Sequence, residues 1–280
     1  MQYRTFAAGV KVSALGIGCG RVGSLNNPVS MREIEAAHEA AVEAGVTLFD
    51  TADVYGQGDS ERTLRRLMKR HPGRMFVVTK VGYTHGPLAS ALRLAKPLLR
   101  AMLRPRPQAR GAVLQARARV MSQNFSTRYL RAAVDRSRRR LGVDCLDGLL
   151  LHDPPCDVLR SSEIRDLLSD LVLRQMVSHV GVSPNSVEEV KTAASIPSVT
   201  MLEVSLSVAR ALSGTPLIDR LRDRNVALFA REILRQSEGE RKSVLPAEAL
   251  SAALAPPFVT SAVVGVSTRA HLKDLLPVVA

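Results

Sequence analysis

An apolar run passes into a polar loop at residues 49–56, which read Phe49-Asp50-Thr51-Ala52-Asp53-Val54-Tyr55-Gly56. This stretch presents a carboxylate, Asp50, and a phenol, Tyr55, five residues apart. A phenol alone is a poor acid at neutral pH because its pKa is near 10, and a neighbouring cation lowers that value. Lys80 offers such a cation at the end of a later apolar run, and a third run ends at His152. We therefore expect these four side chains to form one constellation at the carboxyl ends of three successive strands.

Apolar runs alternate with helical patterns along the whole chain. The runs are continuous, which is typical of strands covered on both faces. The predicted strands are 12–18, 47–52, 76–81, 145–152, 177–183, 199–207, 226–232 and 260–267. The predicted helices are 31–44, 59–70, 126–141, 161–175, 186–194, 215–224, 246–254 and 269–276. Eight such units predict an α/β fold, a (β/α)8 TIM barrel, with its chemistry on the loops that follow the strands.

The bulk composition fits a single barrel domain over residues 1–280. The chain is 46% hydrophobic, enough for a large core, and a barrel of this length is commonly one domain. No apolar run reaches the length of a membrane span, and we see no secretory signal at the N-terminus. We therefore expect a cytoplasmic protein. The net charge of +13 fits either an anionic partner or an arginine-rich proteome.

The cysteines indicate a reducing compartment and no metal site. There are three of them, Cys19, Cys145 and Cys156, an odd and small number. No pair has the spacing of metal ligands with histidines nearby, so the predicted chemistry uses no metal.

A basic insert at about 86–124 interrupts the alternation of strands and helices. Residues 88–120 contain eight basic side chains and no acidic one: Arg93, Lys96, Arg100, Arg104, Arg106, Arg110, Arg117 and Arg119. The first four share one face of a predicted helical stretch, and Leu88, Leu92, Leu99 and Met102 share another. Pro97 interrupts this pattern, so we expect a kinked helix or two short ones.

Three interpretations of the insert stay open. It is a solvated loop, or it docks on an anionic membrane surface or an acidic protein, because it is both basic and amphipathic. In the second case the protein sits at the periphery of a membrane. Nucleic acid is disfavoured, because residues 86–124 contain no aromatic side chain for base stacking.

Six segments resemble the aldo-keto reductase family, in the family's order and over nearly the whole chain. They are residues 12–18, 49–56, 78–80, 149–153, 180–183 and 263–267. The resemblance implies a barrel that reduces an aldehyde or ketone to an alcohol, or runs the reverse reaction, with a nicotinamide cofactor. Arg269 favours NADPH over NADH. The substrate would be a small or lipid-like carbonyl compound.

The resemblance assigns four catalytic roles. Tyr55 is the general acid that delivers a proton to the carbonyl oxygen as hydride reaches the carbon. Lys80 lowers the cost of the phenolate left behind, and Asp50 orients Lys80, since a buried ammonium is costly alone. His152 hydrogen-bonds the same oxygen. Taken singly, Asp50 also fits a loop cap and Tyr55 a packing residue. Lys80 also fits a solvated strand end, and His152 a core histidine.

The resemblance also assigns cofactor-binding positions. Backbone at Gly18 and Cys19 would lie near the nicotinamide, Ser183 and Glu203 would face its carboxamide, and the flat Arg231 side chain would stack on the ring. The adenosine-side phosphate would lie against the loop and helix start that contain Gly265, Ser267 and Arg269.

The chain departs from the family at several of these positions. Pro184 stands where an asparagine is usual, so Asn185 is a candidate substitute, and Glu203 stands where glutamine is usual. An ionised Glu203 can accept a hydrogen bond from the carboxamide nitrogen but cannot donate one to its oxygen. Leu275 replaces a usual asparagine.

The loops are also expected to differ. Residues 233–242 lack the family's glycines, and no C-terminal loop that roofs the pocket follows Ala280. These departures favour a rival reading, a barrel retained as a cofactor-binding or regulatory subunit.

Overall fold

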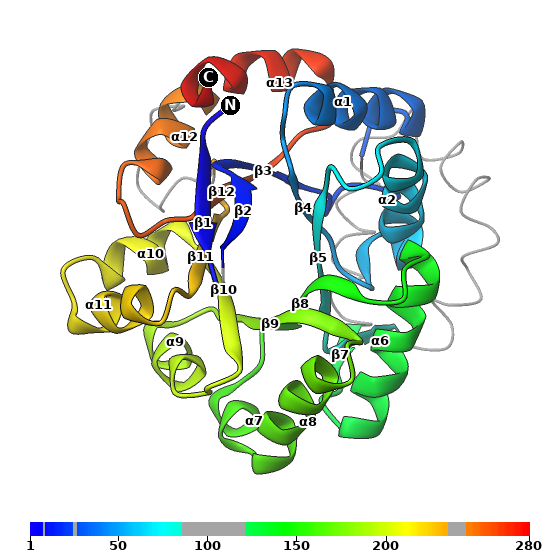
Figure 1. Cartoon of the computed structure of the whole chain (residues 1–280). Coiled ribbons are helices and arrows are strands. Elements are labelled where there is room, and N and C mark those ends of the chain that lie inside the picture. Colours follow the sequence, from blue (N-terminus) through cyan, green and yellow to red (C-terminus); the bar gives the residue numbers. More distant parts are fainter. Residues whose placement is uncertain (8, 25–26, 86–120, 235–244) are drawn as a thin grey trace.

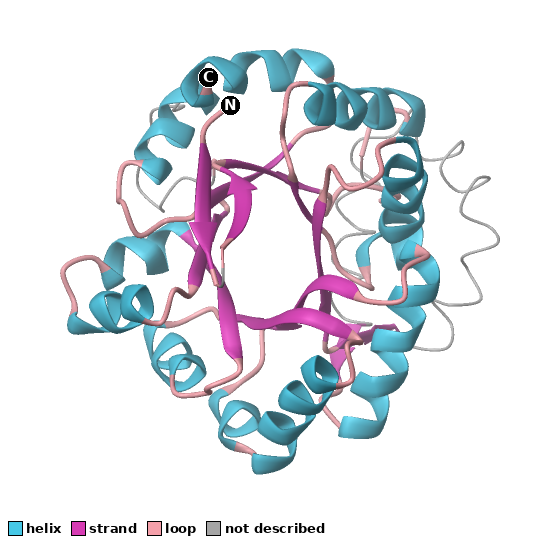
Figure 2. Cartoon of the chain, in the orientation of Figure 1, coloured by secondary structure: helices cyan, strands magenta, loops and turns pink. Residues whose placement is uncertain are grey.

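The computed structural model describes residues 1–7, 9–24, 27–85, 121–234 and 245–280. Within them, eight parallel strands close into a barrel, and the helices surround it (Figures 1 and 2). In barrel order the strands are β3 (Leu15–Gly18), β4 (Leu48–Asp50), β5 (Phe76–Val81), β8 (Leu146–His152), β9 (Val177–Ser183), β10 (Val199–Ser205), β11 (Ala227–Arg231) and β12 (Ser261–Gly265). The predicted TIM barrel is confirmed.

The outer layer consists of helices that follow the strands. They are α1 (Met31–Glu43), α2 (Asp59–Arg70), α6 (Thr127–Leu141), α7 (Cys156–Arg160), α8 (Ser162–Leu173), α9 (Val187–Ala194), α10 (Leu206–Leu212), α11 (Pro216–Asp223), α12 (Pro246–Leu254) and α13 (Arg269–Leu275). Two 3-10 turns, η1 (Tyr55–Gly58) and η2 (Leu276–Val279), complete the set. The bounds of β5, β9, α2 and α12 agree with the prediction. The short helices α7 and α10 were not predicted.

Six of the eight predicted strands extend beyond the observed ones, and local hydrogen bonds explain the ends of two of them. The run 12–18 is divided between β2 (Val10–Ser13) and β3, because the Ser13 hydroxyl donates to the Leu15 carbonyl and accepts from the Thr47 amide. These local hydrogen bonds replace the continuing ladder. The run 199–207 ends at Ser205, whose hydroxyl accepts from the Val208 amide and caps α10.

An N-terminal hairpin closes the amino end of the barrel. β1 (Tyr3–Phe6) pairs antiparallel with β2, and the Phe6 ring meets Phe76 and Phe229 edge to face, with centroids 5.8 and 5.9 Å apart. Phe6 belongs to the cluster that fills the barrel interior, separate from the larger cluster between strands and helices. The hairpin leaves the carboxyl ends of the strands for chemistry.

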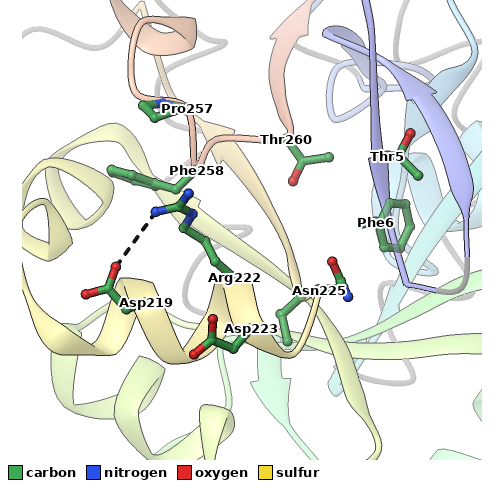
Figure 3. A pocket seen from close by; sticks show the side chains of 10 residues that line it. Thr5, Phe6, Asp219, Arg222, Asp223, Asn225, Pro257, Phe258 and Thr260 are labelled. Atoms are coloured by element: carbon green, nitrogen blue, oxygen red, sulfur yellow. Dashed lines mark ion pairs between the residues drawn. The ribbon is translucent and has the colours of Figure 1, made fainter.

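A polar hollow of about 450 Å³ lies beside this hairpin (Figure 3). It is bordered by Phe6 and by the starts of β11 and β12, and its charged residues Asp219 and Arg222 pair with each other at 3.8 Å. None of the predicted site residues lines it. In TIM barrels this end supports stability rather than catalysis.

The basic insert leaves the barrel through a two-stranded antiparallel ribbon, β6 (Tyr83–His85) and β7 (Met121–Gln123). Residues 86–120 lie outside the described residues, so the expectations about their helical face and their partners remain predictions. Among the helices in the described ranges, none is long and apolar enough to cross a membrane.

Gly181 provides a test of the barrel's packing. It lies on β9 where the ladder to β10 shifts register, and a methyl group there would clash with the Met201 carbonyl and lie 2.7 Å from Leu150 Cδ2. We expect Gly181→Ala to lower the free energy of unfolding by about 2 kcal/mol in urea denaturation, because overpacked cores strain their neighbours. Gly265→Ala is the matched control, since its nearest neighbour is the Gly18 carbonyl at 3.9 Å. Equal stability of the two variants would contradict this account.

Candidate active site

The ammonium of Lys80 is buried at the carboxyl end of the barrel. It forms ion pairs with Asp50, the last residue of β4, and with Glu203 Oε2 on β10, 3.2 Å away, and its side chain is only 1% exposed. It also donates to the Thr51 carbonyl at 3.4 Å. Burial alone would lower the pKa of Lys80, but the two carboxylates outweigh burial and raise it. Lys80 is therefore a fixed positive charge at neutral pH.

Asp50 and Glu203 compete for this single cation. Burial and the Glu203 carboxylate raise the pKa of Asp50, and Lys80 only partly offsets them. Glu203 is 2% exposed and was predicted as a carboxamide ligand, not as a partner of the lysine. The structure thus places Glu203 in contact with Lys80, one of the four predicted catalytic residues.

Tyr55 lies beside the ammonium on the 3-10 turn η1. Lys80 Nζ is 5.4 Å from the centre of the Tyr55 ring. The turn passes so close to Val22 that a side chain at Gly56 (φ 56°) would lie 2.6 Å from its carbonyl oxygen, and it therefore requires glycine. This close packing fixes the position of the phenol.

The direction of the pKa shift of Tyr55 differs from the sequence expectation. Burial raises the pKa of Tyr55 to about 12; Lys80 lowers it, while Asp50 and Glu203 raise it further. The expected lowering by a neighbouring cation is thus present but outweighed. Tyr55 keeps its proton at neutral pH, which is the state a proton donor needs.

His152, the last residue of β8, closes the other side of the group. Its ring meets Tyr55 and Tyr83 edge to face, with centroids 5.9 and 4.9 Å away. Burial, helped by Lys80 and Arg231, lowers the pKa of His152 well below its usual value. The imidazole is therefore neutral, and its buried Nδ1 has no hydrogen-bond partner among the described residues. A neutral imidazole can hydrogen-bond a substrate oxygen.

Arg231, at the end of β11, extends the network of charges. Its Nε lies 3.8 Å from Glu203 Oε1, and its two Nη atoms lie 2.6 Å from Glu232 and from Asn185 Oδ1. Asp153 Oδ1 lies 3.6 Å away. Asn185, the candidate substitute for the usual carboxamide ligand, accepts a hydrogen bond from Arg231 through its Oδ1.

Two residues of the site were not assigned roles from the sequence. Asp153 follows His152 directly and accepts a hydrogen bond from the Tyr83 hydroxyl at 3.2 Å. Gln123 on β7 donates to the Asp153 carbonyl at 2.8 Å. The ribbon that carries the insert is thereby fixed against the site. The position of Asp153 next to His152 was the only signal in the sequence.

The residues that the sequence assigns to the nicotinamide include a group that suits an amide ligand. Ser183 pairs in register with His152, and its buried Oγ has no hydrogen-bond partner among the described residues. A buried, unpartnered hydroxyl beside an imidazole suits a carboxamide. The Cys19 thiol is fully buried, which raises its pKa, so only the backbone of this residue can take part. That backbone donates to the Asp50 carbonyl at 2.8 Å.

The predicted phosphate-binding residues form a second group at the seam between β3 and β12. Gly18 and Gly265 are register partners there, and Ser267 Oγ accepts from Asn27 Nδ2 at 3.4 Å. Arg269 is exposed, and its Nε donates to the Ala36 carbonyl at 3.3 Å. The structure thus separates the predicted cofactor residues into two groups at one end of the barrel.

The family model for the aldo/keto reductase family matches residues 14–252, the stretch that contains nearly all of this site. The chain belongs to the aldo/keto reductase family. It is 35% identical over 156 residues to a D-threo-aldose 1-dehydrogenase of a Pseudomonas species, with 53% of this chain and 42% of the relative covered. It is 26% identical over 202 residues to a Schizosaccharomyces pombe aldo-keto reductase named for NADP(+), with 70% of this chain and 49% of the relative covered.

These alignments span less than half of each curated relative. The solved structures are similar over more of their length. An aldo-keto reductase from Bacillus halodurans, solved in its holo form, superposes with a TM-score of 0.73 at 20% identity, covering all of this chain and 91% of that one. At this identity the likeness establishes the fold.

His38, which was not singled out in the sequence, holds the loop that contains Ser267. It is the buried histidine on the inner face of α1, and its Nε2 lies 3.1 Å from the Val266 carbonyl. Burial lowers the pKa of His38 to about 4. The neutral ring therefore donates to Val266 and fixes the β12–α13 loop against α1.

His38 predicts a measurable pH dependence of stability. Its folded pKa, about 4, is below the unfolded value of 6.5, so the unfolded chain binds an extra proton between these values. The stabilisation is complete above pH 6.5 and falls as pH drops to 4, by about 3 kcal/mol. We expect His38→Gln to flatten the dependence of the free energy of unfolding on pH between pH 4 and 6.5.

His271→Gln is the control, since His271 is exposed on α13, and this variant should keep the wild-type slope. Denaturant titrations between pH 4 and 7 measure all three proteins. Parallel curves for wild type and His38→Gln would show that His38 does not titrate in this way.

Proposed function

We propose that this protein is an NADPH-dependent oxidoreductase that interconverts a small carbonyl compound and its alcohol, with Tyr55 as proton donor. The observation that carries the proposal is a buried, protonated phenol next to a lysine that two carboxylates hold in place. A lysine so costly to bury is expected where its charge serves chemistry. A barrel that only bound a partner would have no need of this arrangement.

The bound cofactor would supply the hydride, and the residues of this chain would supply the proton and its control. Tyr55 Oη gives its proton to the carbonyl oxygen as negative charge builds there. Lys80 stabilises the phenolate that remains, and Asp50 with Glu203 holds Lys80 in position. The neutral His152 hydrogen-bonds the same oxygen and orients the carbonyl.

The residues that would hold the cofactor are those of the two groups at the barrel's carboxyl end. Ser183, Glu203 and Arg231 would face the nicotinamide, along with the backbone of Gly18 and Cys19. The remaining residues, Gly265, Ser267 and Arg269, would face the adenosine-side phosphate. The S. pombe relative named for NADP(+) supports NADPH over NADH.

The names of relatives support a small polar substrate. Besides the aldose dehydrogenase, they include a pyridoxal 4-dehydrogenase of Microbacterium luteolum, 39% identical over 74 residues. Polar side chains also lie at the site, where Tyr83 contacts the His152 ring and donates a hydrogen bond to Asp153. We therefore favour a small hydroxylated aldehyde or ketone over a lipid-like one.

For the basic segment 88–120 we retain the proposal of an anionic membrane surface or an acidic protein as partner. The support for this proposal is the charge of the segment, which contains eight basic side chains and no acidic one. The described ribbon adds that the segment leaves the barrel next to the site. Binding of the whole protein to anionic vesicles at low salt tests the membrane surface, and retention of acidic proteins on it tests the other partner. A protein that binds neither has no such docking role.

Replacement of Tyr55 by Phe tests the proton donor. The variant keeps the ring and loses the hydroxyl, so turnover of a reactive sugar aldehyde should fall at least ~100-fold, the lower scale for a lost acid-base group. Cofactor affinity and the melting temperature should change little. Tyr3→Phe, on the N-terminal hairpin, is the control. Turnover of Tyr55→Phe within a few-fold of wild type would remove Tyr55 from the mechanism.

Arg269→Ala tests the cofactor choice. If the guanidinium faces the adenosine-side phosphate, this variant should bind NADPH about tenfold more weakly, the scale of one hydrogen bond to a charged group. NADH affinity should change little. Lys273→Ala, on an exposed position of the same helix, is the control. Equal losses for both cofactors in calorimetry would argue against the assignment, and a wild type that binds neither would favour the non-catalytic barrel.

A further inference from the structure

The carboxyl end of the barrel contains more carboxyl groups than cations in the part of the chain that the structure describes. Four carboxyl groups share the two cations Lys80 and Arg231 there: Asp50, Asp153, Glu203 and Glu232. His152 is neutral and adds no positive charge. Carboxyl groups therefore outnumber cations among these residues of the site.

Glu203 is the best placed of these acids to act on a ligand. Its two oxygens face different cations, Lys80 at 3.2 Å and Arg231 at 3.8 Å. It is 2% exposed, whereas Glu232 lies at the rim with 36% of its side chain exposed. Its charge is therefore weakly screened by solvent.

A carboxylate at position 203 is not required to hold Lys80 in place. Asp50 already pairs with the ammonium, and a neutral amide at position 203 could accept a hydrogen bond from it equally well. A second buried carboxylate costs desolvation that an amide would not. The extra negative charge therefore calls for a compensating positive charge in the working protein.

We propose that Glu203 makes the site prefer the oxidised nicotinamide cofactor, whose ring is positively charged, over the reduced form, whose ring is neutral. This inference rests on the proposed function. In the proposed reaction, hydride would pass between the ring and the carbon whose oxygen contacts Tyr55, so the ring would lie in contact with that carbon. Lys80 lies next to Tyr55 and in contact with Glu203, so the Glu203 carboxylate would lie near the ring.

Arg231 does not cancel this effect. Its guanidinium is already occupied by Glu232, Asn185 and Asp153 in addition to Glu203. The positive charge of the oxidised nicotinamide ring would therefore lie near a network in which carboxyl groups outnumber cations. The cofactor bound by this protein is shifted toward its oxidised form, which favours alcohol oxidation over carbonyl reduction.

The test compares dissociation constants of NADP+ and NADPH in the full-length protein, by calorimetry for the first and by nicotinamide fluorescence for the second. In Glu203→Gln the ratio of the NADP+ constant to the NADPH constant should rise about tenfold over wild type. Tenfold is the scale of one elementary charge acting over about 12 Å at an effective dielectric constant near 20, and a shorter separation would give a larger rise. Glu203→Ser, a second uncharged and smaller variant, should show the same rise.

Two controls separate charge from shape. Glu203→Asp keeps the carboxylate and should leave the ratio near the wild-type value. Glu188→Gln removes a carboxylate from an exposed position on α9, 61% exposed, and should leave it unchanged. Thermal melts establish that each variant is folded.

A ratio in the uncharged variants within twofold of wild type, with both cofactor forms bound, would overturn the inference and make Glu203 only a counter-ion of Lys80. A wild-type protein that binds neither form would instead overturn the proposed function, and this inference with it. The two failures are therefore distinguishable.

Discussion

The buried ammonium of Lys80 determines the arrangement at the carboxyl end of this barrel. An unpaired ammonium in that position would cost several kcal/mol of stability, so acid must be brought to it from other strands. Asp50 on β4 and Glu203 on β10 supply it, from opposite sides of the barrel. Glu203 in turn pairs with Arg231, and Arg231 with Asp153. One costly cation thus joins the ends of five strands or the loops after them into a single network.

The two ends of the barrel serve different purposes. At the amino end, Phe6 from the N-terminal hairpin fills the interior with aromatic contacts that need no charge. At the carboxyl end, the interior contains Lys80 and Glu203, which no apolar plug could satisfy. Because the hairpin supplies packing at one end, the other end can hold the polar groups that chemistry requires. Core stability and site chemistry are therefore separated along the barrel axis.

The sequence was informative where a residue's role is set by its own strand. Continuous apolar runs gave the eight strands, and the ends of three runs gave Asp50, Lys80 and His152. It was less informative where a role depends on residues far apart in the chain. Glu203 was assigned to a cofactor amide because nothing in the sequence shows that β10 faces Lys80 across the barrel. His38 was passed over for the same reason, since its partner Val266 lies 228 residues away.

The pKa of Tyr55 shows why local chemistry alone was insufficient. A phenol beside an ammonium suggests an acid made stronger, and Lys80 does act in that direction. The same lysine, however, requires two buried carboxylates, which act on the phenol in the opposite direction, as does burial. His152 is affected differently, because burial and the cations Lys80 and Arg231 all lower its pKa. The phenol is thus held protonated and the imidazole neutral. In the proposed reaction, two uncharged hydrogen-bonding groups would thus be available to the substrate oxygen, next to the fixed positive charge of Lys80.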